Sequence, residues 1–173
     1  SVPGSGLDKN ALNNAFYDFK ERFDNEFGGF GIAPKFPSPH NLIFLLRYYK
    51  IFDDKNALEM VTTTLDKMRL GGIFDHIGYG FHRYSTDKNW FLPHFEKMLY
   101  DQAMISMAYL EAFEATKDEK YAAIVEEIFS YVIRDMLNEE GGFFSAEDAD
   151  SEGEEGIFYI WEFEEIINIL GQS

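Results

Sequence analysis

The chain has 173 residues, of which 46% are hydrophobic and 17% aromatic, and it contains no cysteine. This composition is that of a globular domain and excludes a disordered chain, a disulfide framework, a CxxC redox motif and a thiolate zinc site. Thirty-one acidic residues against fifteen basic ones give a net charge of −16, and the sequence shows no basic patch, so nucleic acid is excluded as a partner.

Residues 1–7 match no regular pattern and are expected to be a linker or a leftover of cloning. They have neither a basic region nor an apolar stretch, so no signal peptide is expected. The longest apolar runs, such as residues 42–46, are far shorter than the ~20 residues of a membrane helix. We therefore expect no membrane contact, and the lack of cysteine fits a cytoplasmic location.

Apolar residues recur every three or four positions along most of residues 8–173. This spacing is typical of amphipathic helices and predicts an all-α fold. The six predicted helices span about 8–27, 41–52, 56–70, 95–115, 121–137 and 161–171.

A Gly-Gly pair followed by an aromatic or β-branched residue occurs three times between these helices, at 28–30, 71–73 and 141–143. A recurring pattern of this kind predicts stacked helix pairs, here three, with the Gly-Gly loops at one end. Two of the loops, 73–90 and 143–161, are predicted to contain short β-hairpins, with 157–161 as a return strand. Function is expected at the loop end, because loops carry variable chemistry on a constant scaffold.

Four segments closely resemble the family that includes the spermatogenesis-associated thioredoxin-like proteins. They are GFGIAPKFP at 29–37, FDHIGYGFHRY at 74–84, PHFEKMLYD at 93–101 and SAEDADSEG at 145–153. Members of that family carry an N-terminal thioredoxin-like domain followed by an (α/α)6 toroid similar to N-acylglucosamine 2-epimerase and the six-hairpin glycosidases.

This resemblance implies that residues 8–173 form a partial (α/α)6 toroid of about three helical hairpins, matching its first half, in a fragment of a longer protein. The parent chain would then also carry the thioredoxin-like domain. Helix faces left without neighbours in such a half predict either self-association of the fragment or poor solubility.

Histidines offer the clearest candidates for chemistry, because imidazole titrates near neutral pH. His76, His82 and His94 lie in or beside one loop, and Glu96 is predicted in the first turn of the helix that follows. These four residues are the candidate proton carriers. The alternative is that the imidazoles are structural and bond to backbone carbonyls in a Gly-rich loop.

Candidate substrate-binding residues come from the same loop and from the acidic loop near residue 150: they are Arg83, Tyr84, Trp90, Asp148 and Asp150. An Arg fork can hold hydroxyls or a carboxylate, and flat rings suit the apolar faces of sugars. Lys35 and Lys97 are expected either to anchor a carboxylate or to pair with Glu96 or Asp101.

The acidic loop that starts at Asp148 has the first positions of a calcium loop, but Tyr159 stands where the bidentate Glu would be. The spacing of the histidines is also unlike that of zinc ligands. We therefore expect no metal and no cofactor. The crowded carboxylates favour a neutral or cationic ligand over an anionic one.

Two functions remain open. One is a carbohydrate-active enzyme, a sugar isomerase, epimerase or glycoside hydrolase, that works by acid/base proton transfer on a sugar. The resemblance to the epimerases implies that their histidine pair lies largely on later hairpins, so the fragment is expected to be inactive alone. The other is a non-catalytic scaffold that binds a partner or a client of the thioredoxin-like domain.

Overall fold

The computed structural model describes residues 9–171, so the predicted linker at 1–7 lies outside the described residues. The chain is mainly helical, as the sequence predicts. The α-helices are α1 (Lys9–Arg22), α2 (Pro39–Phe52), α3 (Lys55–Leu70), α4 (Leu99–Thr116), α5 (Glu119–Tyr131) and α6 (Phe163–Leu170). The strands, of two residues each, are β1 (Tyr84–Ser85), β2 (Pro93–His94), β3 (Lys97–Met98), β4 (Ala146–Glu147), β5 (Asp150–Ser151) and β6 (Glu154–Glu155).

The two short connections, α2 to α3 and α4 to α5, are built in the same way. A left-handed residue ends the first helix, Asp53 (φ 53°) in one case and Lys117 (φ 61°) in the other. An aspartate then begins the next helix: Asp54 accepts a hydrogen bond from the backbone N–H of Asn56, and Asp118 accepts one from that of Lys120. Both aspartates are N-caps, which satisfy backbone donors that a helix start leaves open.

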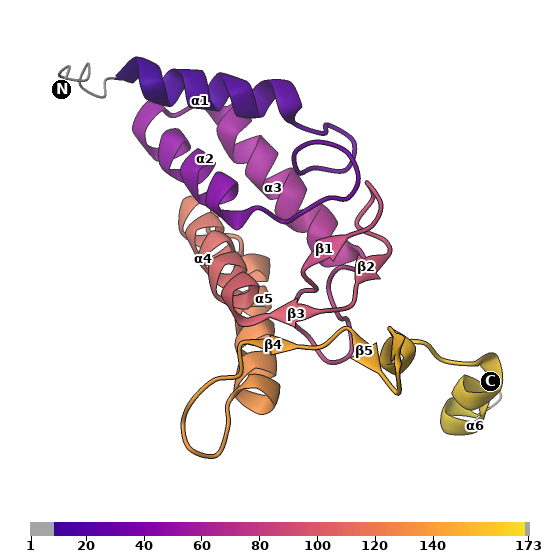
Figure 1. Ribbon diagram of the computed structural model, residues 1–173. Helices are drawn as coiled ribbons and strands as arrows, with labels where there is room; N and C mark the ends of the chain where they lie inside the picture. Colours follow the sequence, from indigo (N-terminus) through magenta and orange to yellow (C-terminus); the bar gives the residue numbers. More distant parts are fainter. Residues whose placement is uncertain (1–8, 172–173) are drawn as a thin grey trace, which may run out of the picture.

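Helix α2 packs against both α3 and α4, and α4 packs against α5 (Figure 1). One apolar core joins these four helices, with Leu45, Leu65, Tyr109 and Ile128 fully buried. The hydroxyl of Tyr109 on α4 donates to the carbonyl of Leu65 on α3 at 2.8 Å, so the buried phenol is satisfied. Helix stacking is thus present, as predicted, among α2 to α5, but α6, which would complete a third pair, contributes no residue to this core.

The three long loops gather at one end of the helices, and adjacent loops are joined by backbone pairing. We call residues 23–38 loop 1, 71–98 loop 2 and 137–162 loop 3. A single β-bridge closes a turn in each loop, between Phe23 and Phe30, Phe74 and Phe81, and Leu137 and Phe143. In loops 1 and 3 the closed turn contains the Gly-Gly pair, whereas in loop 2 the pair at 71–72 precedes it. A bridge between Lys35 and Ser85 joins loop 1 to loop 2, and the β3–β4 pair joins loop 2 to loop 3.

Several predicted boundaries differ from the structure. The first helix ends at Arg22 rather than at 27, and the fourth begins at Leu99 rather than at 95. Helix α5 passes into a π-helical turn at Val132–Met136. The predicted return strand at 157–161 is wrong: Ile157–Tyr159 is a 3-10 turn, and the hairpin in loop 3 is β5–β6.

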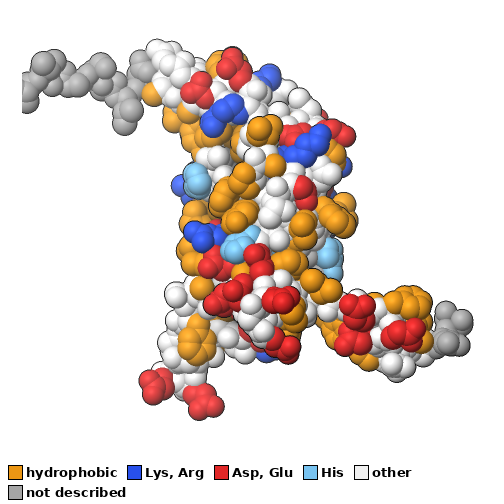
Figure 2. Space-filling view, turned by 45° about the vertical axis from the view of Figure 1, so that its right-hand side comes forward, with side chains coloured by type: hydrophobic (Ala, Val, Ile, Leu, Met, Phe, Trp, Pro, Cys, Tyr) orange, Lys and Arg blue, Asp and Glu red, His pale blue; other side chains and the backbone are white. Residues whose placement is uncertain are grey.

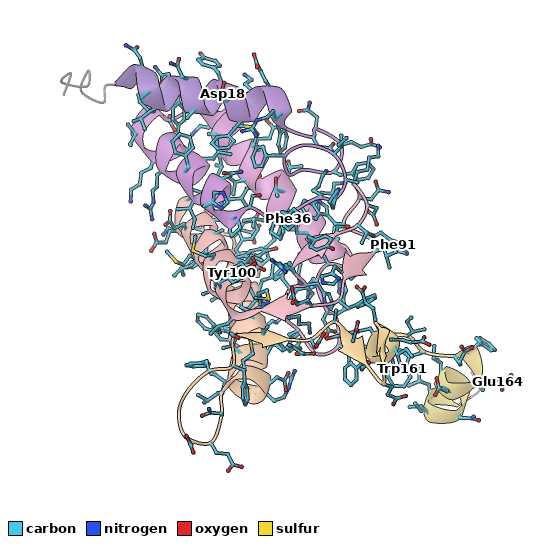
Figure 3. All side chains as sticks on the ribbon, viewed as in Figure 1. Asp18, Phe36, Phe91, Tyr100, Trp161 and Glu164 are labelled. Carbon is cyan, nitrogen blue, oxygen red and sulfur yellow. The ribbon has the colours of Figure 1, made fainter. Side chains whose placement is uncertain are left out.

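Helix α6 stands away from helices α1 to α5 (Figure 3). Trp161 precedes it, and Glu164 lies in its first turn. None of its residues is buried, and Phe163, Ile169 and Leu170 expose between 64% and 78% of their surface. No helix among the described residues is long and apolar enough to cross a membrane.

Candidate functional site

A cluster of charged side chains lies where loop 2 runs into α4. It consists of Arg83, His94, Glu96 and Asp101, and we call it the Arg83 cluster. The backbone N–H of Arg83 donates to the carbonyl of Glu96 at 2.8 Å, which places the two residues opposite each other. Their side chains then form an ion pair, with Arg83 Nη1 and Glu96 Oε2 separated by 2.7 Å.

His94 joins this cluster through the pairing of β1 with β2. That pairing sets Tyr84 opposite His94, and their rings stack with centroids 4.9 Å apart. His94 Nε2 lies 4.0 Å from Glu96 Oε2, and His94 Nδ1 lies 2.7 Å from Glu155 Oε1. A carboxylate of loop 3 therefore holds the imidazole from one side and Glu96 faces it from the other.

Asp101, in the first turn of α4, is the least satisfied member of the cluster. Its side chain is buried, and its Oδ2 has no hydrogen-bond partner in the structure, nor has the buried Nε of Arg83. Burial is the main cause that raises the pKa of Asp101 to about 7. The positive charge of Arg83 lowers this pKa, and the negative charge of Glu96 raises it. The carboxyl group can therefore change its protonation state near neutral pH.

His82 lies behind this cluster, and its environment keeps it neutral. Its ring is buried between those of Phe95 and Tyr159, with centroids 5.4 and 4.9 Å away, and its Nδ1 lies 3.1 Å from the carbonyl of Phe95. Burial, together with the nearby charge of Lys97, lowers the pKa of His82 to about 4. The structural alternative that the sequence left open describes this contact.

The remaining predicted residues lie apart from the Arg83 cluster. His76 is exposed and bonds to Arg69 and to the carbonyl of Gly71. Trp90 is fully buried, and its Nε1 donates to the carbonyl of Phe27 at 2.8 Å, so it belongs to the core rather than to an open binding surface.

Asp148 and Asp150 lie exposed in loop 3, where Asp148 accepts a bond from the N–H of Asp150. On the face shown in Figure 2, many Asp and Glu side chains gather in the lower half of the molecule, close to His side chains. The structure nevertheless contains no group of three or more His, Asp or Glu side chains arranged to hold a metal ion within residues 9–171.

Two buried lysines were not assigned correctly from the sequence. Lys35 Nζ pairs with Asp24 Oδ2 at 2.7 Å, and Lys97 Nζ pairs with Asp75 Oδ2 at 2.8 Å, rather than with Glu96 or Asp101. Each lysine also donates to a backbone carbonyl at 2.9 Å. Nothing in the local sequence marks these pairs, because the partners are separated by 11 and 22 residues.

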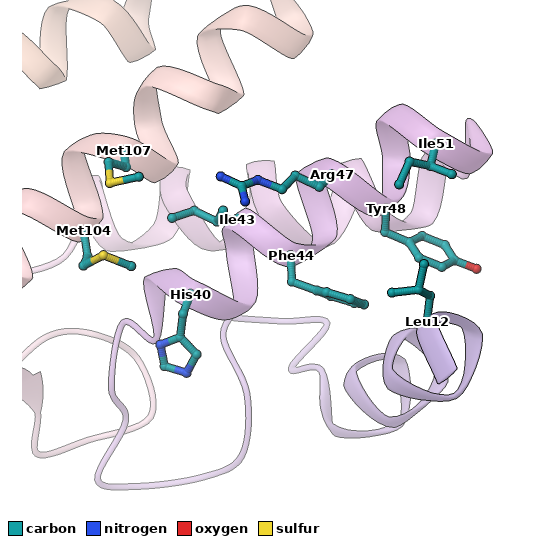
Figure 4. A pocket seen from close by; sticks show the side chains of 9 residues that line it. All are labelled: Leu12, His40, Ile43, Phe44, Arg47, Tyr48, Ile51, Met104 and Met107. Carbon is teal, nitrogen blue, oxygen red and sulfur yellow. The ribbon is translucent and has the colours of Figure 1, made fainter. Parts of the chain in front are cut away.

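An open hollow of about 490 Å³ lies between α1, α2 and α4 (Figure 4). It is mostly apolar, and its one cationic side chain, Arg47, pairs with Glu111 at 2.8 Å. The lining residues are Leu12, His40, Ile43, Phe44, Arg47, Tyr48, Ile51, Met104 and Met107.

Comparison with known proteins agrees with this fold. No family model matches the sequence. The chain is similar in structure to a sugar epimerase from a ruminal bacterium (TM-score 0.69, 17% identity) and to cellobiose 2-epimerase from Bacillus thermoamylovorans (TM-score 0.68, 16% identity). In both cases 80% of this chain matches 40% of the other, which shows the fold, a part of an (α/α)6 toroid, and not the activity.

Sequence similarity is much closer to another group. The chain is 45% identical to mouse spermatogenesis-associated protein 20 over 98% of its length, and 46% identical to the human protein over 91%. It spans about a fifth of those proteins, 22% and 21% of their lengths. The chain is therefore a homologue of spermatogenesis-associated protein 20 that matches one segment of it and folds as part of an epimerase-like toroid.

Proposed function

We propose that this chain supplies part of a carbohydrate site in a longer toroid protein, where a sugar is bound and protons are moved by acid/base groups. One observation carries the proposal: Arg83, His94 and Glu96 converge beside the buried Asp101, whose Oδ2 lacks a partner. A ring nitrogen, two carboxyl groups and a guanidinium are the groups that acid/base chemistry on a polyhydroxyl ligand needs.

The cluster is open enough for a ligand to reach it. The side chains of Glu96 and His94 are each 24% exposed, and that of Arg83 is 41% exposed. Glu96 is fixed by Arg83, so it can orient a hydroxyl group, and His94 presents its Nε2 toward Glu96. Beside them, the ring of Phe36, which is 46% exposed, packs against that of Tyr84 with centroids 4.8 Å apart and offers an apolar surface to a sugar ring.

The similarity to sugar epimerases supports a reaction of the isomerase or epimerase class, in which a proton is removed next to a carbonyl. Glycoside hydrolysis is the second possibility for a carbohydrate-active enzyme. Both epimerases are matched over only 40% of their length. We propose that the chain alone is inactive, and that further hairpins of the parent protein complete the site.

The test uses the parent protein and this chain, each incubated in heavy water with a panel of hexoses and N-acetylhexosamines. Loss of the C2 proton signal by the parent protein only is the expected result. In the parent protein, Glu96→Gln should abolish the exchange, whereas Glu152→Gln, an exposed charge of loop 3, should leave it intact. Exchange that is equally strong in both variants would contradict the role of the Arg83 cluster.

A second function is favoured by the dense internal bonding of this loop end. His82, Trp90 and Lys97 are all buried and bonded to the protein itself, which suits a rigid platform. Under this proposal the toroid is a scaffold for a partner or a client of a thioredoxin-like domain. It is favoured if the parent protein neither exchanges C2 protons nor forms new anomeric signals with any sugar of the panel.

A further inference from the structure

A second pocket, of about 560 Å³, opens where loops 2 and 3 meet the end of α5. It is separate from the hollow of Figure 4, and none of the four Arg83-cluster residues lines it. We call it the Glu147 pocket. Its lining residues are Asp75, Gly78, Lys97, Tyr131, Arg134, Asp135, Met136, Phe144, Ala146, Glu147, Phe158 and Tyr159.

Both cations that line this pocket already have anionic partners. Lys97 is buried and paired with Asp75, and the rings of Tyr131 and Tyr159 lie 4.4 and 5.2 Å from its Nζ. Arg134 pairs with Asp135, the next residue in the chain. These two pairs are each close to neutral, so neither lysine nor arginine offers the pocket a free positive charge.

Glu147 is the one lining carboxylate that forms no ion pair among the described residues. Its two oxygens accept hydrogen bonds from the hydroxyls of Tyr131 and Tyr159, at 2.7 and 2.9 Å. Burial raises the pKa of both phenols, and the charge of Glu147 raises it further, so the tyrosines stay neutral donors. The lining as a whole therefore carries one uncompensated negative charge.

Two exposed phenylalanines and a π-helical turn form much of the rest of the wall of the Glu147 pocket. Phe144 and Phe158 are 54% and 70% exposed. The π-helical turn Val132–Met136 carries three of the lining residues. Turns of this type are rare in proteins and are found frequently at functional sites.

We propose that the Glu147 pocket binds an organic cation, a ligand that carries an ammonium group on a short apolar stem. Glu147 is the counter-ion of the ammonium group, and the exposed phenylalanines contact the stem and the face of the cation. The surrounding charge favours the same class: residues 135–173 contain twelve Asp and Glu and no Lys, Arg or His. Such a field attracts cations and repels anions.

The experiment titrates this chain with three probes of equal length, butylammonium, butanol and butyrate, and follows backbone amide signals by NMR. Saturable shifts confined to the lining residues with butylammonium, at least about tenfold weaker with butanol and absent with butyrate, are expected. Equal affinity for butanol, or no saturable shift with butylammonium, would overturn the proposal.

One variant and a matched control test whether Glu147 is the counter-ion. Glu147→Gln keeps an oxygen acceptor for the tyrosines and removes the charge, so it should weaken butylammonium binding about tenfold. Glu152→Gln removes the same charge from an exposed position of loop 3 and should change the affinity less than about twofold. Equal losses in the two variants would show a general charge effect and overturn the proposal.

Phe158→Ala provides a readout that does not depend on Glu147, in case that variant unfolds. Because Phe158 is exposed, the substitution should leave the circular dichroism spectrum unchanged and weaken butylammonium binding severalfold. Unchanged affinity in Phe158→Ala would contradict the aromatic contact. The sugar assay proposed above uses another cluster, so the two proposals can fail separately.

Discussion

The buried carboxyl group of Asp101 makes the pH dependence of stability a direct test of the Arg83 cluster. In the unfolded chain this group loses its proton near its ordinary pKa of 3.8, whereas in the folded chain the pKa is about 7. Between these values unfolding releases a proton, so the free energy of unfolding falls as the pH rises and levels off above pH 7. Three pKa units correspond to about 4 kcal/mol in total.

Asp101→Asn removes this titration without changing the shape of the side chain. Relative to the wild type, the variant should gain about 2 kcal/mol of unfolding free energy between pH 5.5 and pH 8. The measurement is urea unfolding followed by circular dichroism at half-unit pH steps. For Asp148→Asn, which removes an exposed charge, the plot of unfolding free energy against pH should run parallel to that of the wild type. Parallel curves for Asp101→Asn and the wild type would refute the reasoning.

Three further outcomes follow from the packing. Lys97→Met leaves the buried carboxylate of Asp75 without its partner and should lower the free energy of unfolding in urea by about 3–5 kcal/mol. Lys55→Met, at an exposed ion pair, should lower it by less than about 1 kcal/mol. Equal losses of unfolding free energy would contradict the difference in burial. His82→Ala should lower the melting temperature clearly because the ring is buried, and an unchanged temperature in calorimetry would restore His82 as a surface proton carrier. The apolar face of α6 should drive self-association, and a monodisperse monomer in light scattering would rule this out.

The helices were predictable because the spacing of apolar residues is a local pattern. Their ends were not, because they depend on contacts with residues distant in the sequence. Helix α1 stops at Arg22 because Phe23 bridges to Phe30 and the side chain of Asp24 caps the following turn. Helix α4 starts late because β3 (Lys97–Met98) is held by strand β4, 48 residues further on. Neither partner can be found by reading a window of one helix.

The error at 157–161 has a similar origin. The run of aromatic and β-branched residues there favours a strand, yet Gly156 has a φ of 78°, and a 3-10 turn follows it. A Cβ at Gly156 would lie 2.6 Å from the ring of Phe95. The turn lets the hydroxyl of Tyr159 reach Glu147, so a tertiary contact outweighs the local preference.

Three of the four residues of the Arg83 cluster could be found from the sequence, because Arg83, His94 and Glu96 lie in motifs rich in charged and titratable side chains. The burial of Trp90 could not, since an aromatic residue in a Gly-rich loop fits a binding surface and a core equally well. The surrounding backbone decides between the two: a Cβ at Gly71 would collide with the carbonyl oxygen of Trp90. Loop 2 is thus pressed onto the end of α3 and the indole is enclosed.

A repeated device explains how the loop end is held, and why loop 3 differs. In loop 1, Asp24 accepts backbone bonds with Oδ1 and pairs with Lys35 through Oδ2; in loop 2, Asp75 does the same with Lys97. The backbone of each lysine also pairs with the next loop, Lys35 with Ser85 and Lys97 with Glu147. The same residue therefore neutralises the aspartate and joins two loops.

In loop 3 the corresponding residue is Asn138, whose Oδ1 accepts from the N–H of Gly142 in the same manner. No lysine follows it within this chain, and an amide leaves no charge that would need one. The aspartate and the lysine are therefore absent together, as expected if each is retained only to neutralise the other in a buried position. Loop 3 is instead fastened by neutral tyrosine hydroxyls on Glu147, and this is what leaves a negative charge at its pocket.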